Sequence, residues 1–429
     1  MSLPSTVQLN CGQTLPGRYA KSALSEHLSD DRGIPLPEYI NLYKHFASQP
    51  GVGLVISGHM MVSRKGRGEL GNVCFSKRDF ESTETPLISQ LKKTVEASRQ
   101  GNPNVKLLAQ INHCGRQIPK KVLKTNFIED SGSHYKDRAI SFYDRACPGL
   151  SLMFPNPLCI KDELPFFEKG DVVNSPILNE LVDEYSQTAE CVVRKCGYDG
   201  VQLHTAHGYL MNDIVTNGGW AVFRKVLEAC RAKIGFSSIL GVKINIPDTD
   251  LSAKEYSDNL IAIANDEAIL LDFVEFSAGS YSKPVMMSST GHFTLDFGTI
   301  FRQALEATKS GCKVMVTGRF TSAEMADKAI IESKVDLVGF GRAFCLPQPF
   351  DESTTRIIRG GLPLCKFSAS VIYQLAKLVP MFSTGPNTMY WADWMAKVAR
   401  GEVSTNKEVE DYKIKGTGFA WYISMLKKL

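Results

Sequence analysis

The chain has 429 residues, 43% of them hydrophobic and 22% charged, a balance typical of a globular protein with a sizeable core and not of a disordered chain. Its formal net charge of +4 is spread without a block of Lys and Arg, so nothing indicates binding to nucleic acid or to an acidic membrane surface. No stretch approaches the roughly 20 apolar residues of a membrane span, and the first residues lack the apolar segment of a secretory signal. We expect a cytoplasmic protein that binds a small-molecule substrate, with a homo-oligomer left open.

Short apolar or β-branched runs recur along the chain, each closed by a polar residue or glycine and followed by a helical segment. Such runs are typical of buried parallel strands. In chain order they lie at 17–25, 53–59, 105–113, 198–207, 239–245, 271–280, 312–319 and 335–342. Strand and helix therefore alternate eight times.

Helix signals fill the gaps between these runs. Pro176, preceded by Asn and Ser, is suited to the first turn of a helix that Gly197 would end. Capping-box spacing predicts two further helix starts, at Ser252 with Glu255 and at Thr321 with Glu324.

Eight such units can close into a barrel or lie open as a doubly wound sheet, and periodicity does not decide between them. Reactive side chains recur here at the ends of many strands, as in barrels, whereas an open sheet gathers them at one crevice. The predicted fold class is α/β, a (β/α)8 TIM barrel over residues 1–359. A long loop or subdomain after the third strand (114–173) would lie over the site. Residues 360–429 would form a helical extension packed on the barrel.

Two imidazoles and a phenol follow the fourth predicted strand, from His204, His207 and Tyr209. Their place at the end of a strand favours an active site, and structural histidines with a core tyrosine are the alternative. A zinc site that adds His113 is a second alternative, but no carboxylate or thiol stands at ligand spacing. The eleven cysteines are irregularly spaced without a C-x-x-C pair, so we predict neither a metal site nor disulfides.

Two glycine-arginine pairs end the seventh and eighth predicted strands, Gly318-Arg319 and Gly341-Arg342. Glycine lets backbone N–H groups approach a ligand closely, and a guanidinium binds anions with several donors. Barrels commonly bind phosphate at these two loops. A turn followed by a surface arginine explains either pair alone, but the recurrence favours a phosphate site.

Lys243 ends the fifth predicted strand inside an otherwise apolar run. An unpaired charge there would be costly, so we expect an anionic partner.

Five motifs in this order carry a resemblance to the old yellow enzyme family: GRYAKSALSE (17–26), AQINHCGRQ (109–117), HTAHGYL (204–210), TGRFTSAE (317–324) and GFGRAF (339–344). The resemblance runs from about residue 9 to about residue 350. It implies bound FMN, with NADH or NADPH as the reductant.

The resemblance also implies roles for single residues. Gln110 would bind the pyrimidine edge of the flavin, since an amide both donates and accepts, and Lys243 would face flavin N1 and the C2 carbonyl. Many members carry Arg at this position, and a lysine keeps the charge without the planar fork. The remaining cofactor-binding positions are the segment Ser22, Ala23, Leu24 and Ser25 along the ring, together with His59.

The implied reaction has two halves in one site. NADH or NADPH gives hydride to flavin N5, and an α,β-unsaturated carbonyl compound then accepts it at the β-carbon. His204 and His207 would hydrogen-bond the carbonyl oxygen as negative charge develops there. Tyr209 would donate a proton to the α-carbon.

Two positions depart from the family pattern. The segment after Tyr209 keeps Gly218 and Gly219 but lacks the Ser and the Glu-Asn-Arg of the family signature and is several residues shorter. Gly17 replaces an Asn, which we interpret as a tolerated change in a local turn. Two alternatives to this FMN-dependent reductase stay open. One is a weakened or non-catalytic flavin-binding relative, and the other is a flavin-free lyase or isomerase that binds a phosphorylated substrate.

Overall fold

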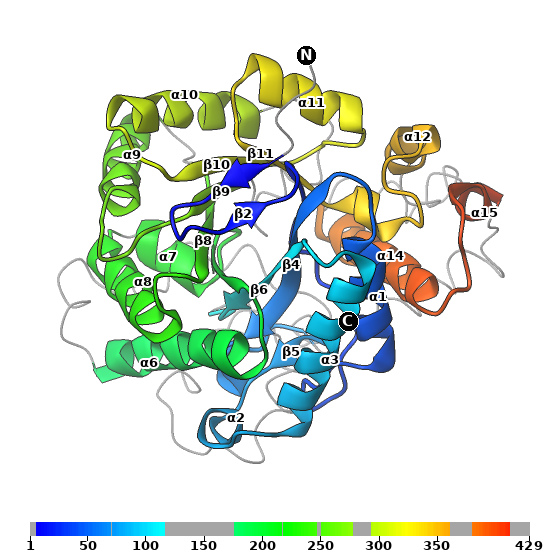
Figure 1. Ribbon diagram of the computed structural model, residues 1–429, viewed down its shortest axis with the longest axis horizontal. Coiled ribbons are helices and arrows are strands. Elements are labelled where there is room, and N and C mark those ends of the chain that lie inside the picture. The colour runs from blue at the N-terminus through cyan, green and yellow to red at the C-terminus, as the bar shows by residue number, and fades with distance from the viewer. Residues whose placement is uncertain are drawn as a thin grey trace.

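The computed structural model describes residues 6–69, 71–115, 176–216, 218–246, 250–277, 293–360 and 380–411. Within these ranges, eight parallel strands form a ring with helices around it (Figure 1). The ring closes because β3 (Tyr19–Lys21) pairs with β4 (Val52–Met61) on one side and with β11 (Leu337–Phe340) on the other. The predicted (β/α)8 barrel is confirmed.

The other five strands of the ring follow in chain order, and all eight overlap the predicted runs. They are β6 (Lys106–Asn112), β7 (Gly200–Thr205), β8 (Ile239–Asn245), β9 (Phe273–Ser277) and β10 (Lys313–Thr317). Outside the ring, β5 (Val73–Cys74) pairs with the end of β4, and β1 (Val7–Gln8) forms a hairpin with β2 (Thr14–Leu15).

Helices connect the strands and cover the outside of the ring. Up to β8 they are α1 (Pro37–Ala47), η1 (Arg64–Gly66), α2 (Lys77–Glu81), α3 (Pro86–Gly101), α6 (Pro176–Glu190), the π-helix η4 (Cys191–Lys195), α7 (Leu210–Thr216) and α8 (Trp220–Ile234). After β8 they are α9 (Asp250–Ala264), α10 (Phe293–Ala307), α11 (Ala323–Glu332), η6 (Arg342–Cys345), α12 (Glu352–Gly360), α14 (Pro380–Ala399) and α15 (Asn406–Asp411). Of the predicted insertion, only its first two residues lie within the described ranges.

The predicted bounds of α6 are confirmed, whereas the predicted start of α9 is wrong by three residues, since a cap at Ser252 would begin the helix at residue 253. Helix α6 begins at Pro176, and the helical segment that continues through η4 stops before Gly197. Gly197 adopts φ +86°, a left-handed conformation that glycine adopts without strain. Helix α9 begins at Asp250, so Ser252 lies in its first turn and does not precede it.

The predicted cap of α11 is also wrong, by one residue. Ser322 is the N-cap, and its side chain accepts a hydrogen bond from the backbone N–H of Met325. The Thr321 hydroxyl instead lies 2.9 Å from the hydroxyl of Thr355 on α12. Two adjacent hydroxyl residues can each cap a helix, and the packing of α12 decides between them.

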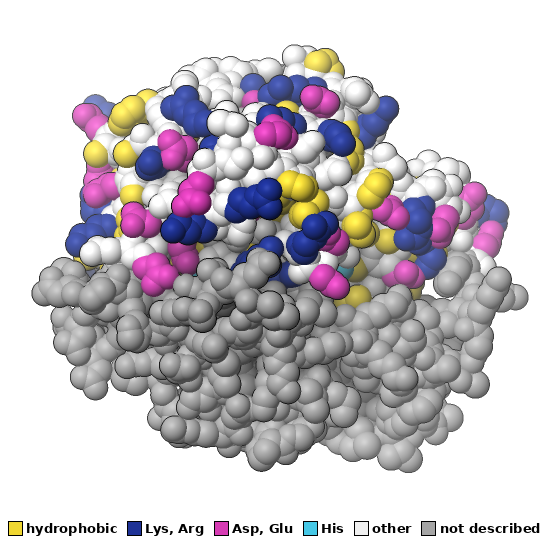
Figure 2. Space-filling model, turned by 90° about the horizontal axis from the view of Figure 1, so that it is seen from below, with side chains coloured by type: hydrophobic (Ala, Val, Ile, Leu, Met, Phe, Trp, Pro, Cys, Tyr) yellow, Lys and Arg dark blue, Asp and Glu magenta, His cyan; other side chains and the backbone are white. Residues whose placement is uncertain are grey.

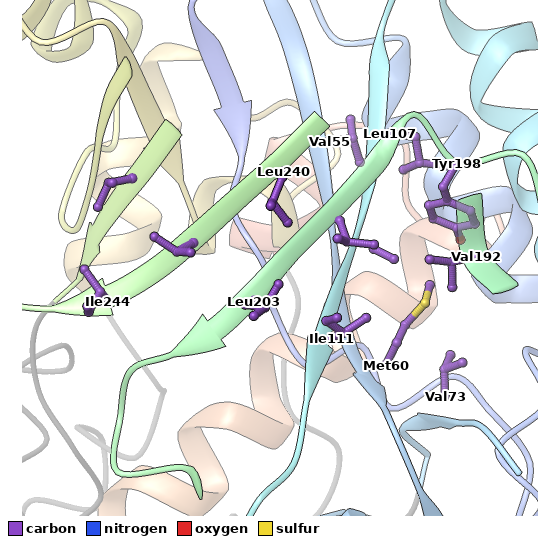
Figure 3. Close-up of a cluster of buried hydrophobic side chains, with 14 of the residues drawn as sticks. Val55, Met60, Val73, Leu107, Ile111, Val192, Tyr198, Leu203, Leu240 and Ile244 are labelled. Atoms are coloured by element: carbon purple, nitrogen blue, oxygen red, sulfur yellow. The ribbon is translucent and has the colours of Figure 1, made fainter. Parts of the chain in front are cut away.

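The larger part of the core lies between the strands and the helices. Val55, Leu107, Leu203 and Leu240 come from four neighbouring strands and all belong to this layer (Figure 3). Each is at most 2% exposed, and burying such a side chain stabilises a fold by about 1.5–3 kcal/mol. Side chains one residue further along each strand point into the barrel, because strand side chains alternate.

A second apolar cluster fills the amino end of the barrel. Val7, Leu9 and Leu15 of the β1–β2 hairpin pack against Phe273 and Leu337, which point inward from the starts of their strands. The hairpin is held there by hydrogen bonds to the loops before the strands; for example, the Asn10 amide donates to the Leu271 carbonyl over 2.7 Å. The amino end of the barrel is therefore closed by apolar side chains.

Gly17 is required by a close backbone contact, so its interpretation as a tolerated change in a turn is wrong. A Cβ at Gly17 would lie 2.2 Å from the carbonyl oxygen of Gly51, and a Cβ at Gly53 would lie 2.2 Å from the carbonyl oxygen of Gly17. We expect Gly17→Asn to lower the free energy of unfolding by about 3 kcal/mol, since relief of the clash must move two backbone segments. Urea unfolding measures this. Gly12→Asn is the control without a clash, because a Cβ at Gly12 meets nothing within 4 Å, and asparagine adopts the left-handed conformation of Gly12 (φ +86°) at a smaller cost than other side chains.

Part of the predicted C-terminal extension packs on the barrel. Helix α14 lies beside α1, where the Asn41 amide donates to the Ala399 carbonyl, and Trp394 is 1% exposed. Asn406 at the start of α15 exchanges hydrogen bonds with Gln348. These contacts fit the predicted extension, while the boundary at residue 359 stays a prediction.

The described surface carries charges of both signs. In Figure 2, Lys and Arg side chains are interspersed with Asp and Glu over the described part of the face. In those parts of the chain that the structure describes, no helix combines the length and apolar character needed to cross a membrane.

Candidate active site

Four aromatic rings meet at the carboxyl ends of β4 and β7. The ring centroid of His204 lies 4.9 Å from that of Tyr209, 5.1 Å from that of His207 and 5.2 Å from that of His59, each pair edge to face. Tyr209 also packs edge to face on His59 at 5.1 Å. The structure thus brings together the three residues predicted to be catalytic and places the predicted cofactor ligand His59 among them.

Burial keeps these imidazoles neutral at pH 7. Burial lowers the pKa of His59 to about 4, although the charges of Glu69 and Glu26 oppose the change. Burial also holds the pKa of His204 well below its usual range, and repulsion from His207 and His59 adds to the effect. For His207, burial and then the Lys243 ammonium lower the pKa in the same direction.

Hydrogen bonds orient both histidines, and the one to His204 also fixes which ring nitrogen carries the proton. The Nδ1 of His204 accepts from the backbone N–H of Ala206 over 3.2 Å, so the neutral ring carries its proton on Nε2 and is a donor there. The Nε2 of His207 lies 2.9 Å from the hydroxyl of Ser277 on β9, and its backbone N–H donates to the side chain of Asn245 on β8. His207 has φ +62°, a strained conformation that these contacts hold in place.

His113, the third histidine of the zinc alternative, is oriented differently. Its Nδ1 accepts from the backbone N–H of Gly115 over 3.0 Å. Among the residues with a described placement, no three His, Cys, Asp or Glu side chains are grouped so as to hold a metal ion.

A chain of buried polar side chains crosses the barrel interior below the rings. The Gln110 amide donates to the Gln202 carbonyl oxygen over 2.7 Å, and the Gln202 amide donates to the Glu275 carboxylate over 2.7 Å. The Lys243 ammonium lies 3.3 Å from the other oxygen of Glu275. All four side chains are at most 4% exposed, and the Oε1 of Gln110 has no hydrogen-bond partner. The anionic partner expected for Lys243 is therefore Glu275.

The two predicted glycine-arginine pairs lie at the carboxyl ends of neighbouring strands, β10 and β11. Gly318 has φ +134° and Arg319 φ +64°, so the chain turns sharply there. Burial lowers the pKa of the Arg319 guanidinium. It also lowers the pKa of Arg342, and the like charge of Arg319 adds to this effect. Two neighbouring, partly buried cations of one sign favour an anion between them.

The predicted first-strand segment reaches the same end of the barrel. The Ser22 hydroxyl lies 2.8 Å from the Thr317 hydroxyl at the end of β10. Leu24 lies against Gly341, since a Cβ added at Gly341 would be 3.5 Å from the Leu24 side chain. Ala23 packs against the second apolar cluster, inside the barrel. The Ser25 hydroxyl donates to Glu69, a residue that the sequence analysis did not select.

The short segment after Tyr209 forms a compact junction between α7 and α8. The N–H of Gly219 donates to the Ile214 carbonyl over 2.8 Å, and Gly218 has φ +85°. Trp220 then begins α8 and packs edge to face on Tyr256. The missing Ser and Glu-Asn-Arg are thus replaced by a direct helix-helix turn at the rim of the site.

Sequence reasoning missed Gln202, Glu275, Ser277 and Asn112, whose amide lies 3.1 Å from His59 Nδ1. A signal was present for two of them, since Gln202 stands two residues before His204 and Glu275 two before Ser277, on the inward face of each strand. Each polar residue lies in an apolar run, as Lys243 does.

Comparisons with known proteins agree with this geometry. The model of the NADH:flavin oxidoreductase / NADH oxidase family matches residues 8–219. The NADH-dependent flavin oxidoreductase iliE of Hypocrea jecorina is 25% identical over 374 residues, which cover 80% of this chain and 85% of that protein. The old yellow enzyme homologue of Zymomonas mobilis superposes with a TM-score of 0.57 and 16% identity over 96% of this chain and 100% of that chain. The chain is similar to the NADH:flavin oxidoreductases and has the fold of the old yellow enzymes. The predicted class of enzyme, an oxidoreductase that uses FMN with NADH or NADPH, is confirmed at the level of this family.

A further solved structure shows how far the likeness extends. The 2-naphthoyl-CoA reductase in complex with 2-naphthoyl-CoA superposes with a TM-score of 0.61 and 16% identity over 83% of this chain. The chain spans only about half of that larger protein, 52% of its length. At these identities the solved structures establish the fold alone.

Proposed function

We propose that this protein reduces the C=C bond of α,β-unsaturated carbonyl compounds with electrons from NADH or NADPH. The observation that carries the proposal is the cluster of His204, His207 and Tyr209 beside the buried chain that holds Gln110 and Lys243. The proposed donors to the carbonyl oxygen and the proposed proton donor therefore lie next to the side chains that would bind the polar edge of the flavin ring.

The residues fit FMN. Gln110 has an unsatisfied Oε1 in a buried position, which suits the imide N–H of a flavin. Lys243 supplies a cation from β8, which β7 separates from Gln110 on β6. Arg319 and Arg342 would supply the anion site that the phosphate needs. When bound, FMN accepts hydride from the nicotinamide and delivers it to the alkene.

The protein's own groups would act on the substrate carbonyl and the α-carbon. The neutral imidazoles of His204 and His207 donate hydrogen bonds to the carbonyl oxygen and stabilise the enolate charge without giving up a full proton. Tyr209, whose ring packs on His204, holds the proton for the α-carbon. The closed amino end of the barrel keeps bulk water away from that side of the site.

A spectrum of the purified protein tests the proposal. We expect flavin absorbance that bleaches under anaerobic titration with NADH or NADPH and returns when an activated alkene is added. Bound flavin that the nicotinamide does not reduce would favour the non-catalytic alternative, which the compact α7–α8 junction motivates. A colourless protein that takes up no added FMN would overturn the proposal and favour the flavin-free alternative.

The arginine pair gives a prediction on cofactor affinity. We expect Arg342→Gln to weaken FMN binding by about tenfold to a hundredfold, since one charge-assisted hydrogen bond contributes about 1.5–3 kcal/mol. Binding of riboflavin, which lacks the phosphate, should change by less than threefold. Fluorescence titration of the apoprotein measures both, with Arg356→Gln as a control because Arg356 pairs with Glu410 on the surface. An equal loss for both ligands would contradict the assignment.

A further inference from the structure

The buried carboxylate of Glu275 stands at the centre of the polar chain and has no role in the reaction as proposed above. One of its oxygens accepts from Gln202 and the other faces Lys243, and the side chain is fully buried on the inward face of β9. Register places Glu275 opposite Lys243 on β8, while Gln110 on β6 lies opposite Gln202 on β7. One carboxylate therefore connects both expected flavin contacts.

The direction of every hydrogen bond in the chain follows from the chemistry of a carboxylate. An ionised carboxylate only accepts, so Gln202 must turn its NH2 toward Glu275 and its carbonyl oxygen toward Gln110. Gln110 must then turn its own NH2 toward Gln202, which leaves its Oε1 as the atom without a partner. Glu275 thus makes Gln110 an acceptor toward the site.

The same carboxylate compensates the charge of Lys243. At 3.3 Å in a buried setting, the pair is screened little by water. Lys243 therefore presents less net positive charge to the site than an unpaired ammonium would.

We propose that Glu275 is a positioning residue that sets the donor-acceptor polarity and the charge of the cofactor site through Gln202 and Lys243. The inference rests on the proposed FMN function. It assigns to the chain a cofactor site that selects an imide N–H and holds the reduced, anionic flavin less tightly than a site with an isolated lysine.

The charge is tested by the midpoint potential of bound FMN, measured by anaerobic dye titration. We expect Glu275→Gln to shift the equilibrium between oxidised and reduced flavin at least tenfold toward the reduced form. For a two-electron couple, this raises the midpoint potential by about 30 mV or more. Glu275→Asp should stay within threefold of the native protein. In a Lys243→Met background, Glu275→Gln should have no further effect. Asp272→Asn, which breaks a buried ion pair with Arg231 below the site, is the control for general destabilisation and should leave the potential unchanged.

The polarity is tested by binding of FMN and of 3-methyl-FMN, which lacks the imide N–H, to the apoprotein. The native protein should prefer FMN at least tenfold. Glu275→Gln should narrow the preference for FMN over 3-methyl-FMN to less than threefold, because the side-chain amides of Gln110 and Gln202 are then able to flip. If that variant does not fold, Gln202→Met interrupts the same chain while Lys243 and Glu275 stay paired, and it should narrow the preference for FMN equally.

The outcomes separate the two proposals. A native apoprotein that binds neither flavin overturns the proposed function and this inference with it. A native protein that binds FMN while Glu275→Gln leaves both the potential and the 3-methyl preference unchanged overturns the inference alone. If Glu275→Gln shifts the potential by the same amount in the Lys243→Met background, Glu275 does not act through Lys243, and the inference is also overturned.

Discussion

Replacing Tyr209 by Phe is expected to slow alkene reduction by about 10²- to 10⁴-fold, the usual contribution of a positioned proton donor. Reduction of the flavin by NADH or NADPH needs no proton from this residue and should stay within threefold of the native rate. The Phe ring retains the edge-to-face contacts with His59 and His204, so the site keeps its shape. Stopped-flow measurement of the two half-reactions separates the effects.

Tyr185→Phe is the matched control for this substitution. Tyr185 is a buried tyrosine on α6 and belongs neither to the ring cluster nor to the buried polar chain. Both half-reactions should be unchanged in that variant. The largest effect of Tyr209→Phe is expected on weakly activated alkenes, because strongly activated ones tolerate protonation by solvent. Full activity of Tyr209→Phe on weakly activated alkenes would remove Tyr209 from the mechanism.

Acid should destabilise the protein well above the range in which carboxylates titrate. The pKa of His59 is about 4 in the folded protein and about 6.5 when unfolded, and the pKa values of His204 and His207 are lowered in the same direction. Between those values the unfolded chain binds protons that the folded chain does not, so stability is complete above pH 6.5 and is lost as the pH falls toward the folded values. The expected loss from pH 7 to pH 5 is about 2 kcal/mol for His59, and His204 and His207 act in the same direction.

Urea unfolding at pH 7, 6 and 5 measures the acid effect. His59→Gln should remove about 2 kcal/mol of the difference between pH 7 and pH 5, since its side chain no longer titrates. Tyr185→Phe serves as the control, because a substitution that only alters packing leaves the pH dependence intact. Identical pH dependence in the native protein and in His59→Gln would show that the His59 imidazole is not held neutral by the fold.

The sequence predicts the barrel well because its signals are local. Each strand is a short apolar run closed by a polar residue, and this pattern does not depend on which strands become neighbours. His204, His207 and both glycine-arginine pairs stand at strand ends for the same reason. Their convergence follows from closure of the ring, which brings all carboxyl ends to one face.

The parts that the sequence did not predict depend on register and packing between strands. Lys243 required an anionic partner, but only the pairing of β8 with β9 identifies it as Glu275. Gln202 is an ordinary strand residue until β6 places Gln110 beside it. The requirement for Gly17 likewise comes from a contact with a separate segment at Gly51. Spacing along the chain carries no information about such contacts.

The β1–β2 hairpin determines how small molecules reach the interior. Val7, Leu9 and Leu15 close the amino end of the barrel with apolar side chains, so the barrel interior is not accessible from that end. Under the proposed function, the nicotinamide and the alkene must then both enter and leave the site through the carboxyl end of the barrel. Turnover under the proposed function is accordingly an alternation, in which the spent nicotinamide has to depart before the alkene takes its place.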